Sequence, residues 1–100
     1  MPSQYRILTQ HPEGKQGATI EREKYDLIRC TILDALQRER EMTSFELGKT
    51  VESKVDKYFE GHVQWYYTTV KLDLEAREEI ERIPGKAPQT LRLARDRLIV

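Results

Sequence analysis

The apolar residues of this chain recur at helical spacing as far as residue 77 and then alternate as in a β-strand. Residues 21–38, 43–61 and 62–77 carry apolar side chains three and four positions apart, which predicts three helices. Between residues 80 and 93 the period falls to two, and the turn-rich run 84–88 divides this stretch into two strands. The sequence therefore predicts an α+β fold in which three helices precede a β-hairpin.

A capping box gives the second predicted helix the sharpest boundary in the chain. The Thr43 hydroxyl can accept the amide of Glu46, while the Glu46 carboxylate accepts the amide of Thr43. Met42 and Leu47 then occupy the two positions of a hydrophobic staple. Gly61 is expected to end this helix as a left-handed cap.

The apolar stripes of the three helices together predict the core. Gly48 lies inside the second helix, where glycine costs about 1 kcal/mol relative to alanine, so we expect another helix to approach closely there. Cys30, in the first helix, is expected to behave as a small, partly buried apolar residue. The residues expected at the centre of the core are Ile28, Ile32, Val51, Val55, Val70 and Leu74.

The third predicted helix has a second apolar face, roughly opposite the one that faces the core. This face holds Trp65, Thr69, Leu72 and Ala76. Two interpretations are open. In the first, strands from the N-terminal part of the chain cover the face. In the second, Trp65 and Leu72 are exposed and bind a protein partner or a second copy of the chain, because tryptophan is enriched at the energetic centres of interfaces.

The two ends of the chain carry weaker patterns. The first twenty residues predict a strand, a turn around Gly14 and a second strand, with a loose N-terminal arm as the alternative. A chain of 100 residues suits a single domain. Its expected parts are an arm at 1–20, three helices at 21–79, a hairpin at 80–93 and a tail without assigned structure at 94–100.

Charge and cysteine content exclude several classes of protein. The 17 basic residues balance 17 acidic ones, so no global field draws the chain to nucleic acid or to an anionic membrane. Cys30 is the only cysteine, which excludes an intrachain disulfide and a cysteine-rich zinc site. No apolar run reaches the roughly 18 residues that cross a bilayer. The first residues also lack the apolar segment of a secretion signal, so we expect a cytoplasmic protein without membrane contact.

The sequence contains no group of residues that predicts catalysis. His11 falls in a predicted turn and His62 at a helix start, and their spacing is not that of metal ligands. Asp73 and Glu75 point about 200° apart on a helix, so they cannot share a substrate as a carboxylate pair. We therefore expect no enzymatic activity, no cofactor and no bound metal.

Helix, capped helix, helix and β-hairpin is the order of a winged helix. The second and third helices would form the helix-turn-helix unit, and the hairpin would be the wing. Such domains place the third helix in the major groove of double-stranded DNA, which makes DNA the first candidate partner. Gln64, Thr68 and Lys71 are then expected to face the bases, and Arg82, Lys86 and Arg92 the phosphates.

The charges near this surface support DNA binding only in part. The segment 80–100 is basic, with Arg82, Lys86, Arg92, Arg95 and Arg97 against Glu81 and Asp96. The third helix is neutral, however, since two basic residues balance two acidic ones. Because phosphate contacts dominate affinity, we expect weak DNA binding at most. A protein-interaction or dimerisation module without DNA binding is the alternative.

Three segments carry a resemblance to a known family. They are Trp65-Tyr66-Tyr67-Thr68-Thr69-Val70-Lys71-Leu72-Asp73-Leu74-Glu75-Ala76-Arg77, Ile80-Glu81-Arg82-Ile83-Pro84-Gly85 and Pro88-Gln89-Thr90-Leu91-Arg92. With them the chain resembles, over about residues 20–93, a family of short bacterial proteins of unknown function that look like winged-helix proteins. Relatives tend to have a small polar cap where His62 stands and a glycine where Glu78 stands. The resemblance implies the fold but no activity.

Overall fold

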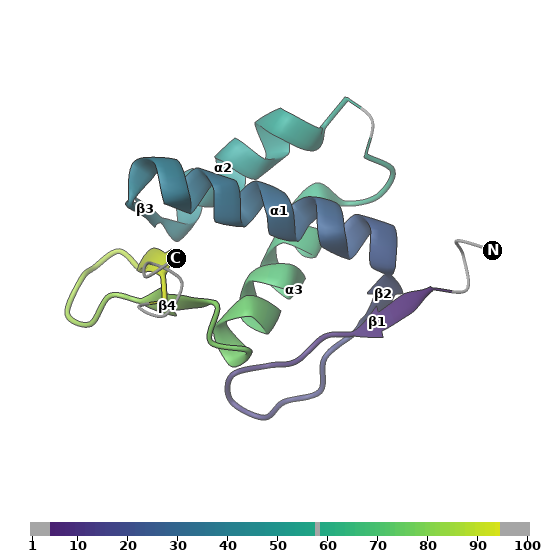
Figure 1. Cartoon of the computed structure of the whole chain (residues 1–100), viewed down its shortest axis with the longest axis horizontal. Helices are drawn as coiled ribbons and strands as arrows, with labels where there is room; N and C mark the ends of the chain where they lie inside the picture. The colour runs from purple at the N-terminus through teal and green to yellow at the C-terminus, as the bar shows by residue number, and fades with distance from the viewer. Residues whose placement is uncertain (1–4, 58, 95–100) are drawn as a thin grey trace.

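The computed structural model describes residues 5–57 and 59–94 (Figure 1). It confirms an α+β fold of three helices and two small antiparallel sheets. In chain order the elements are β1 (Arg6–Leu8), β2 (Thr19–Glu21), α1 (Arg22–Glu39), β3 (Glu41–Thr43), α2 (Ser44–Val55), α3 (Val63–Ala76), β4 (Ile80–Arg82) and β5 (Thr90–Leu93). Within the described ranges, no helix combines the length and the apolar character needed to span a membrane.

The helices pack around one apolar cluster. α1 crosses over α2 and α3 (Figure 1), and its inward face follows the predicted stripe. The core prediction is confirmed, since Ile28, Ile32, Val51, Val55, Val70 and Leu74 are all fully buried in this cluster. Cys30 lies on the outer side of α1 and is exposed, so the expectation that it is partly buried is wrong.

Local signals place the start of α2 correctly. The Thr43 hydroxyl accepts the Glu46 amide at 3.1 Å, and the Glu46 carboxylate accepts the Thr43 amide at 3.0 Å, as the capping box requires. Gly48 also has its predicted role. A Cβ atom at Gly48 would lie 3.0 Å from the Tyr67 ring of α3, so a side chain there would push the two helices apart.

The end of α2 differs from the prediction. The helix ends at Val55. The Asp56 amide still makes a helical hydrogen bond, because it donates to the Glu52 carbonyl four residues earlier. Gly61 lies in the loop between α2 and α3 with a φ of 131°, so it does not cap α2. Tyr58, which the predicted apolar stripe included, lies outside the described residues.

The C-terminal sheet has the strand order β3-β5-β4 and joins distant parts of the chain. The predicted hairpin is confirmed as β4 and β5, with Arg82 opposite Leu91. The third strand was not predicted. β3 contains only Glu41, Met42 and Thr43, and Met42 pairs with Leu91 on β5. A three-residue strand shows no usable alternation, so its conformation depends on this long-range pairing.

The N-terminal strand pair is also confirmed. β1 and β2 are antiparallel, with Ile7 opposite Ile20, and they pack beside the start of α1 (Figure 1). Ile20 is buried in the core cluster, and Ile7 packs against it. At the other end of the chain, Ala94 donates its amide to the Glu79 carbonyl at 3.1 Å. The rest of the predicted tail, which includes Arg95 and Arg97, lies outside the described residues.

The two departures from the resembled family both lie at the ends of α3. At its start, His62 caps the helix, because its Nδ1 accepts the Trp65 amide at 3.4 Å. At its end, Glu78 has a φ of 63°, in the left-handed region that favours glycine. The Glu78 amide donates to the Glu75 carbonyl and the Glu79 amide to the Leu74 carbonyl. These bonds form a Schellman motif, whose left-handed position is usually occupied by glycine.

We expect Glu78→Gly to stabilise the protein by about 0.5–1 kcal/mol. The left-handed conformation costs a non-glycine residue roughly 1–2 kcal/mol, and the greater backbone entropy of glycine offsets part of the gain. Urea denaturation measures the difference in free energy of unfolding. Glu23→Gly, in the first turn of α1, is the control and should lower this free energy. A loss of stability in Glu78→Gly would contradict the strain argument.

Candidate functional site

The basic residues of the C-terminal hairpin are paired with carboxylates of the same chain. Each residue expected to contact DNA phosphates has one partner within ion-pair distance. The pairs are Arg82 Nε with Glu75 Oε1 at 2.5 Å, Lys86 Nζ with Glu41 Oε1 at 2.5 Å, and Arg92 Nε with Glu81 Oε2 at 2.7 Å. A phosphate would have to replace these carboxylates, and the pairs cancel most of the positive field of the hairpin. Arg95 and Arg97 lie outside the described residues.

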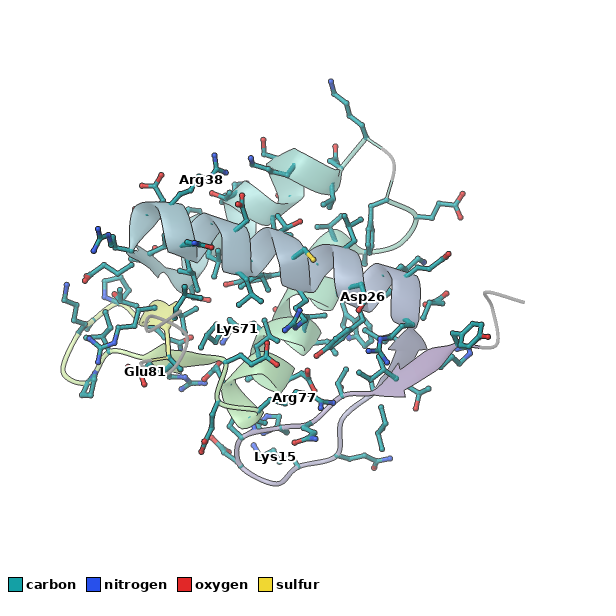
Figure 2. The ribbon with its side chains drawn as sticks, in the orientation of Figure 1. Lys15, Asp26, Arg38, Lys71, Arg77 and Glu81 are labelled. Carbon is teal, nitrogen blue, oxygen red and sulfur yellow. The ribbon has the colours of Figure 1, made fainter. Side chains whose placement is uncertain are left out.

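The polar strip of α3 is less accessible than the sequence indicates. Lys71 is buried between α3 and the C-terminal hairpin (Figure 2), where its Nζ contacts Glu75 at 2.8 Å and Gln89 at 3.1 Å. It therefore does not occupy the exposed position expected for a base contact. Gln64 is partly buried and donates its amide to the Gly48 carbonyl at 3.1 Å. Of the three residues expected to face the bases, only Thr68 is exposed.

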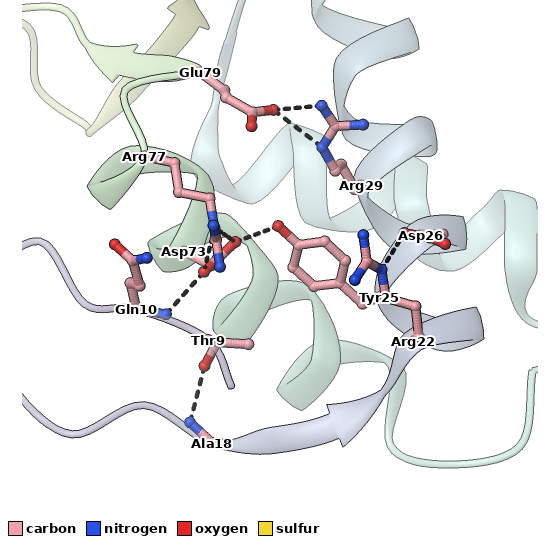
Figure 3. A network of polar contacts seen from close by, with 10 residues as sticks. All are labelled: Thr9, Gln10, Ala18, Arg22, Tyr25, Asp26, Arg29, Asp73, Arg77 and Glu79. Atoms are coloured by element: carbon pink, nitrogen blue, oxygen red, sulfur yellow. Dashed lines mark hydrogen bonds and ion pairs between the residues drawn. The ribbon is translucent and has the colours of Figure 1, made fainter. Parts of the chain in front are cut away.

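A buried polar network joins the N-terminal hairpin, α1 and α3 (Figure 3). Its centre is Asp73, whose side chain is fully buried. Its carboxylate accepts hydrogen bonds from the Tyr25 hydroxyl, from the backbone amide of Gln10 at 2.8 Å and from Arg77 Nε at 2.9 Å. Burial, followed by the hydrogen bond to Asp73, raises the pKa of Tyr25 well above its usual value. The hydrogen bond to Asp73 likewise raises the pKa of Arg77.

This network holds elements together. Both carboxylate oxygens of Asp73 are engaged by donors from three different parts of the chain. A second pair nearby, Arg29 with Glu79 at 2.7 Å, joins α1 to the segment before β4 (Figure 3). Of these contacts, the bond from the Gln10 backbone amide to Asp73 fixes the loop after β1 against α3.

A groove of about 220 Å³ lies between that loop and the second apolar face of α3. We call it the Trp65 groove. One side consists of residues 9–11 and 16–18, and the other of Trp65, Thr69 and Leu72. Of the described residues that line it, none is Asp, Glu, Lys or Arg, although charged residues make up 34% of the chain. Among the described lining residues only His11 is titratable, so the groove is a hollow without Asp, Glu, Lys or Arg on a highly charged protein.

The walls of the Trp65 groove are fixed by short contacts. The Thr9 amide donates to the Ala18 carbonyl, and the Ala18 amide donates to the Thr9 hydroxyl, both at 2.8 Å. Gly17 has no room for a side chain, because a Cβ atom there would lie 1.8 Å from the Thr9 carbonyl oxygen. The backbone amide of Gln10 donates a hydrogen bond to the Asp73 carboxylate. The loop is therefore held in place on α3.

Trp65 and Leu72 line the groove, and the side chains of both remain partly exposed to solvent. Trp65 is 47% exposed, and its ring meets the Tyr66 ring edge-on at 5.1 Å between centroids. Leu72 is half-buried. The N-terminal hairpin (β1, β2 and the loop between them) thus flanks the second apolar face of α3 and leaves part of it open. The face is therefore neither fully covered by the N-terminal strands nor fully exposed, the two outcomes that the sequence left open. The loop residues that complete the groove were not predicted, because no local pattern reveals which residues a loop brings to a distant helix.

Elsewhere the surface carries many paired charges. Arg38 with Asp34 and Lys15 with Glu13 are examples at opposite sides of the molecule (Figure 2). Among residues 5–57 and 59–94, three other large apolar side chains are exposed, namely Tyr5, Leu8 and Phe45. In the part of the chain that is described, no three His, Cys, Asp or Glu side chains gather as metal ligands.

Taken together, fold and surface define a small α+β domain with three helices, two antiparallel sheets and a groove without Asp, Glu, Lys or Arg beside a half-exposed tryptophan. The chain belongs to a family of unknown function (DUF6958), whose model matches residues 6–91. No curated protein and no solved structure matches the chain.

Proposed function

We propose that this chain is a winged-helix domain that binds a protein partner, or a second copy of itself, through the Trp65 groove. The observation that carries the proposal is a groove lining without Asp, Glu, Lys or Arg around a half-exposed tryptophan. Interface centres are depleted in charged residues and enriched in aromatic ones, and tryptophan is prominent among the residues that dominate binding energy.

The order of elements supports the winged-helix part of the proposal. α1, α2 and α3 precede the β4–β5 hairpin, and α2 and α3 are the pair that would form a helix-turn-helix. Fold does not determine the partner, because one fold can host unrelated functions. The choice between partners therefore depends on the surfaces themselves.

Double-stranded DNA is the second candidate. Three basic residues lie on or near the C-terminal hairpin, and Thr68 is exposed on α3. Against this, Arg82, Lys86 and Arg92 already contact carboxylates. Non-specific DNA affinity comes almost entirely from phosphate contacts, so paired cations predict very weak binding.

Two measurements on the same protein distinguish these functions. We expect no association with random duplex DNA at low ionic strength and about 100 μM protein, the weak end of ordinary non-specific binding, in fluorescence anisotropy. The double variant Glu41→Gln, Glu81→Gln releases Lys86 and Arg92. It should bind measurably, with a log–log salt slope of only about −2, because each neutralised phosphate contributes about −0.9. In sedimentation equilibrium at rising concentration, we expect a dimer if the partner is a second copy. Trp65→Ala should then weaken this dimer without unfolding the chain.

Phe45→Ala is the matched control for Trp65→Ala. Phe45 is also an exposed aromatic residue, at 75%, but it lies in the first turn of α2 and does not line the groove. The control should leave sedimentation unchanged. Low-micromolar binding of DNA by the wild type, abolished by Arg82→Ala and unaffected by Trp65→Ala, would contradict the proposal in favour of the second candidate.

A further inference from the structure

We infer that the Trp65 groove recognises one uncharged apolar side chain of an extended peptide segment. The inference rests on the proposed function and names the chemistry of the partner. Such a partner would place a leucine-like or phenylalanine-like residue between α3 and the loop after β1, with its backbone running over the rim.

The size of the groove argues for a single side chain. Its volume of about 220 Å³ is below the roughly 300–1,000 Å³ of pockets that enclose drug-sized ligands. It is also several times the roughly 30 Å³ that one water molecule occupies in the liquid. A compact anchor residue fits this range, whereas a nucleotide or a cofactor does not.

The charge of the groove selects among anchor residues. By the proportion of charged residues in the chain, about three of the nine lining residues would carry a charge, but none is Asp, Glu, Lys or Arg. A cationic anchor would lose water without meeting a carboxylate in the described lining, which is costly. An apolar anchor gains from burial against Trp65 and Leu72. The lining therefore favours an uncharged apolar side chain.

The rim of the groove suits a peptide backbone. Gln10 and Gln16 stand on the two arms of the loop, and both are exposed. A glutamine amide both donates and accepts hydrogen bonds, and a peptide backbone offers one donor and one acceptor per residue. Uncharged amides opposite the apolar wall of Trp65 and Leu72 are thus complementary to an extended segment with one apolar anchor.

The groove is also formed before a partner binds. Thr9 and Ala18 hold the two arms together, and Asp73 binds the loop to α3. A binding surface that is already ordered avoids the entropy cost of ordering it on association. For this reason a single capped amino acid should bind detectably.

The test uses capped amino acids as probes. Trp65 is the only tryptophan in the chain, so its indole N–H signal in a ¹H–¹⁵N NMR spectrum is unambiguous. Titration with N-acetyl-leucinamide should shift this signal saturably, with a Kd on the order of millimolar for a ligand of this size. N-acetyl-lysinamide should bind at least about tenfold more weakly, because its ammonium group would be buried without a carboxylate in the described lining.

Two variants and one control locate the binding. Leu72→Lys places a charge in the groove, and Thr69→Phe fills it, so either should abolish the shift caused by the leucine probe. Phe45→Lys, at an exposed position outside the groove, should leave it unchanged. The dispersion of the spectrum shows for each variant that the chain is folded, and Thr69→Phe serves if Leu72→Lys does not fold.

Three results would overturn the inference. They are the absence of a saturable shift with the leucine probe, equal binding of the lysine probe, or binding that survives both groove variants. These results are independent of the anisotropy and sedimentation measurements. A chain that dimerises through Trp65 but takes no probe retains the proposed function and loses this inference.

Discussion

Val70→Asp is expected to leave the protein unfolded at room temperature. Val70 is fully buried on α3, among apolar side chains of all three helices. An aspartate there must either bury an unpaired carboxylate or take up a proton and still lack hydrogen-bond partners. The cost of several kcal/mol is comparable with the roughly 5–15 kcal/mol by which a native domain is stable.

Thermal unfolding followed by far-UV circular dichroism measures the effect. The control is Thr68→Asp, which adds the same carboxylate two residues earlier on the exposed side of α3. It should change the free energy of unfolding by no more than about 0.5 kcal/mol. If Val70→Asp melts like the wild type, the packing of α3 in the core is wrong.

Asp73→Ala is expected to cost about 3 kcal/mol of stability. The substitution removes the acceptor shared by three donors, and it leaves the buried Tyr25 hydroxyl and the Arg77 guanidinium without this partner. Breaking a buried, hydrogen-bonded charge pair on one side typically costs about 3–5 kcal/mol. The exposed part of the Arg77 side chain reduces this, since water can reach it.

Asp34→Ala offers a closely matched comparison. Asp34 pairs with Arg38 four residues later on a helix, as Asp73 does with Arg77, but both members of the first pair are largely exposed. Its loss should cost about 0–1 kcal/mol. Urea denaturation of both variants gives the two free energies of unfolding. Equal, small losses would show that the buried network contributes no more than a surface ion pair.

Local patterns in the sequence determined the helices and much of the core. The capping box of Thr43 and Glu46 and the stripe through Val51 and Val55 involve residues within four positions of one another. Helical periodicity is set by the chain itself, so the face that carries the apolar residues can be identified before its partners are known. The alternating residues of β4 and β5 predicted the C-terminal hairpin for the same reason.

The ends of elements were less predictable. Gly61 was expected to cap α2, but α2 ends six residues earlier at Val55. β3 was missed because three residues hold a strand conformation only through their pairing with β5. Glu78 adopts a left-handed conformation that glycine usually takes, because the hydrogen bonds donated by the backbone amides of Glu78 and Glu79 to the last turn of α3 require it.

The candidate sites were decided by tertiary structure. Lys71 lies on the polar strip of α3 by helical spacing, but Glu75 and Gln89 bury its ammonium group beneath the C-terminal hairpin. Arg82, Lys86 and Arg92 look like free cations in the sequence, and their carboxylate partners lie between 7 and 45 positions away. Spacing within one element cannot reveal such partners.

Sequence alone, then, determined which residues form the helices and which of their faces turn inward, since both follow from the fixed period of the backbone. It also identified Trp65 and Leu72 as a second apolar face of α3. Only the tertiary structure decided that this face becomes one wall of a groove, because Asp73 binds the loop after β1, 63 residues away in the sequence, and holds it across α3. Long-range contacts of this kind depend on how the elements pack, and they leave no periodic trace in the chain.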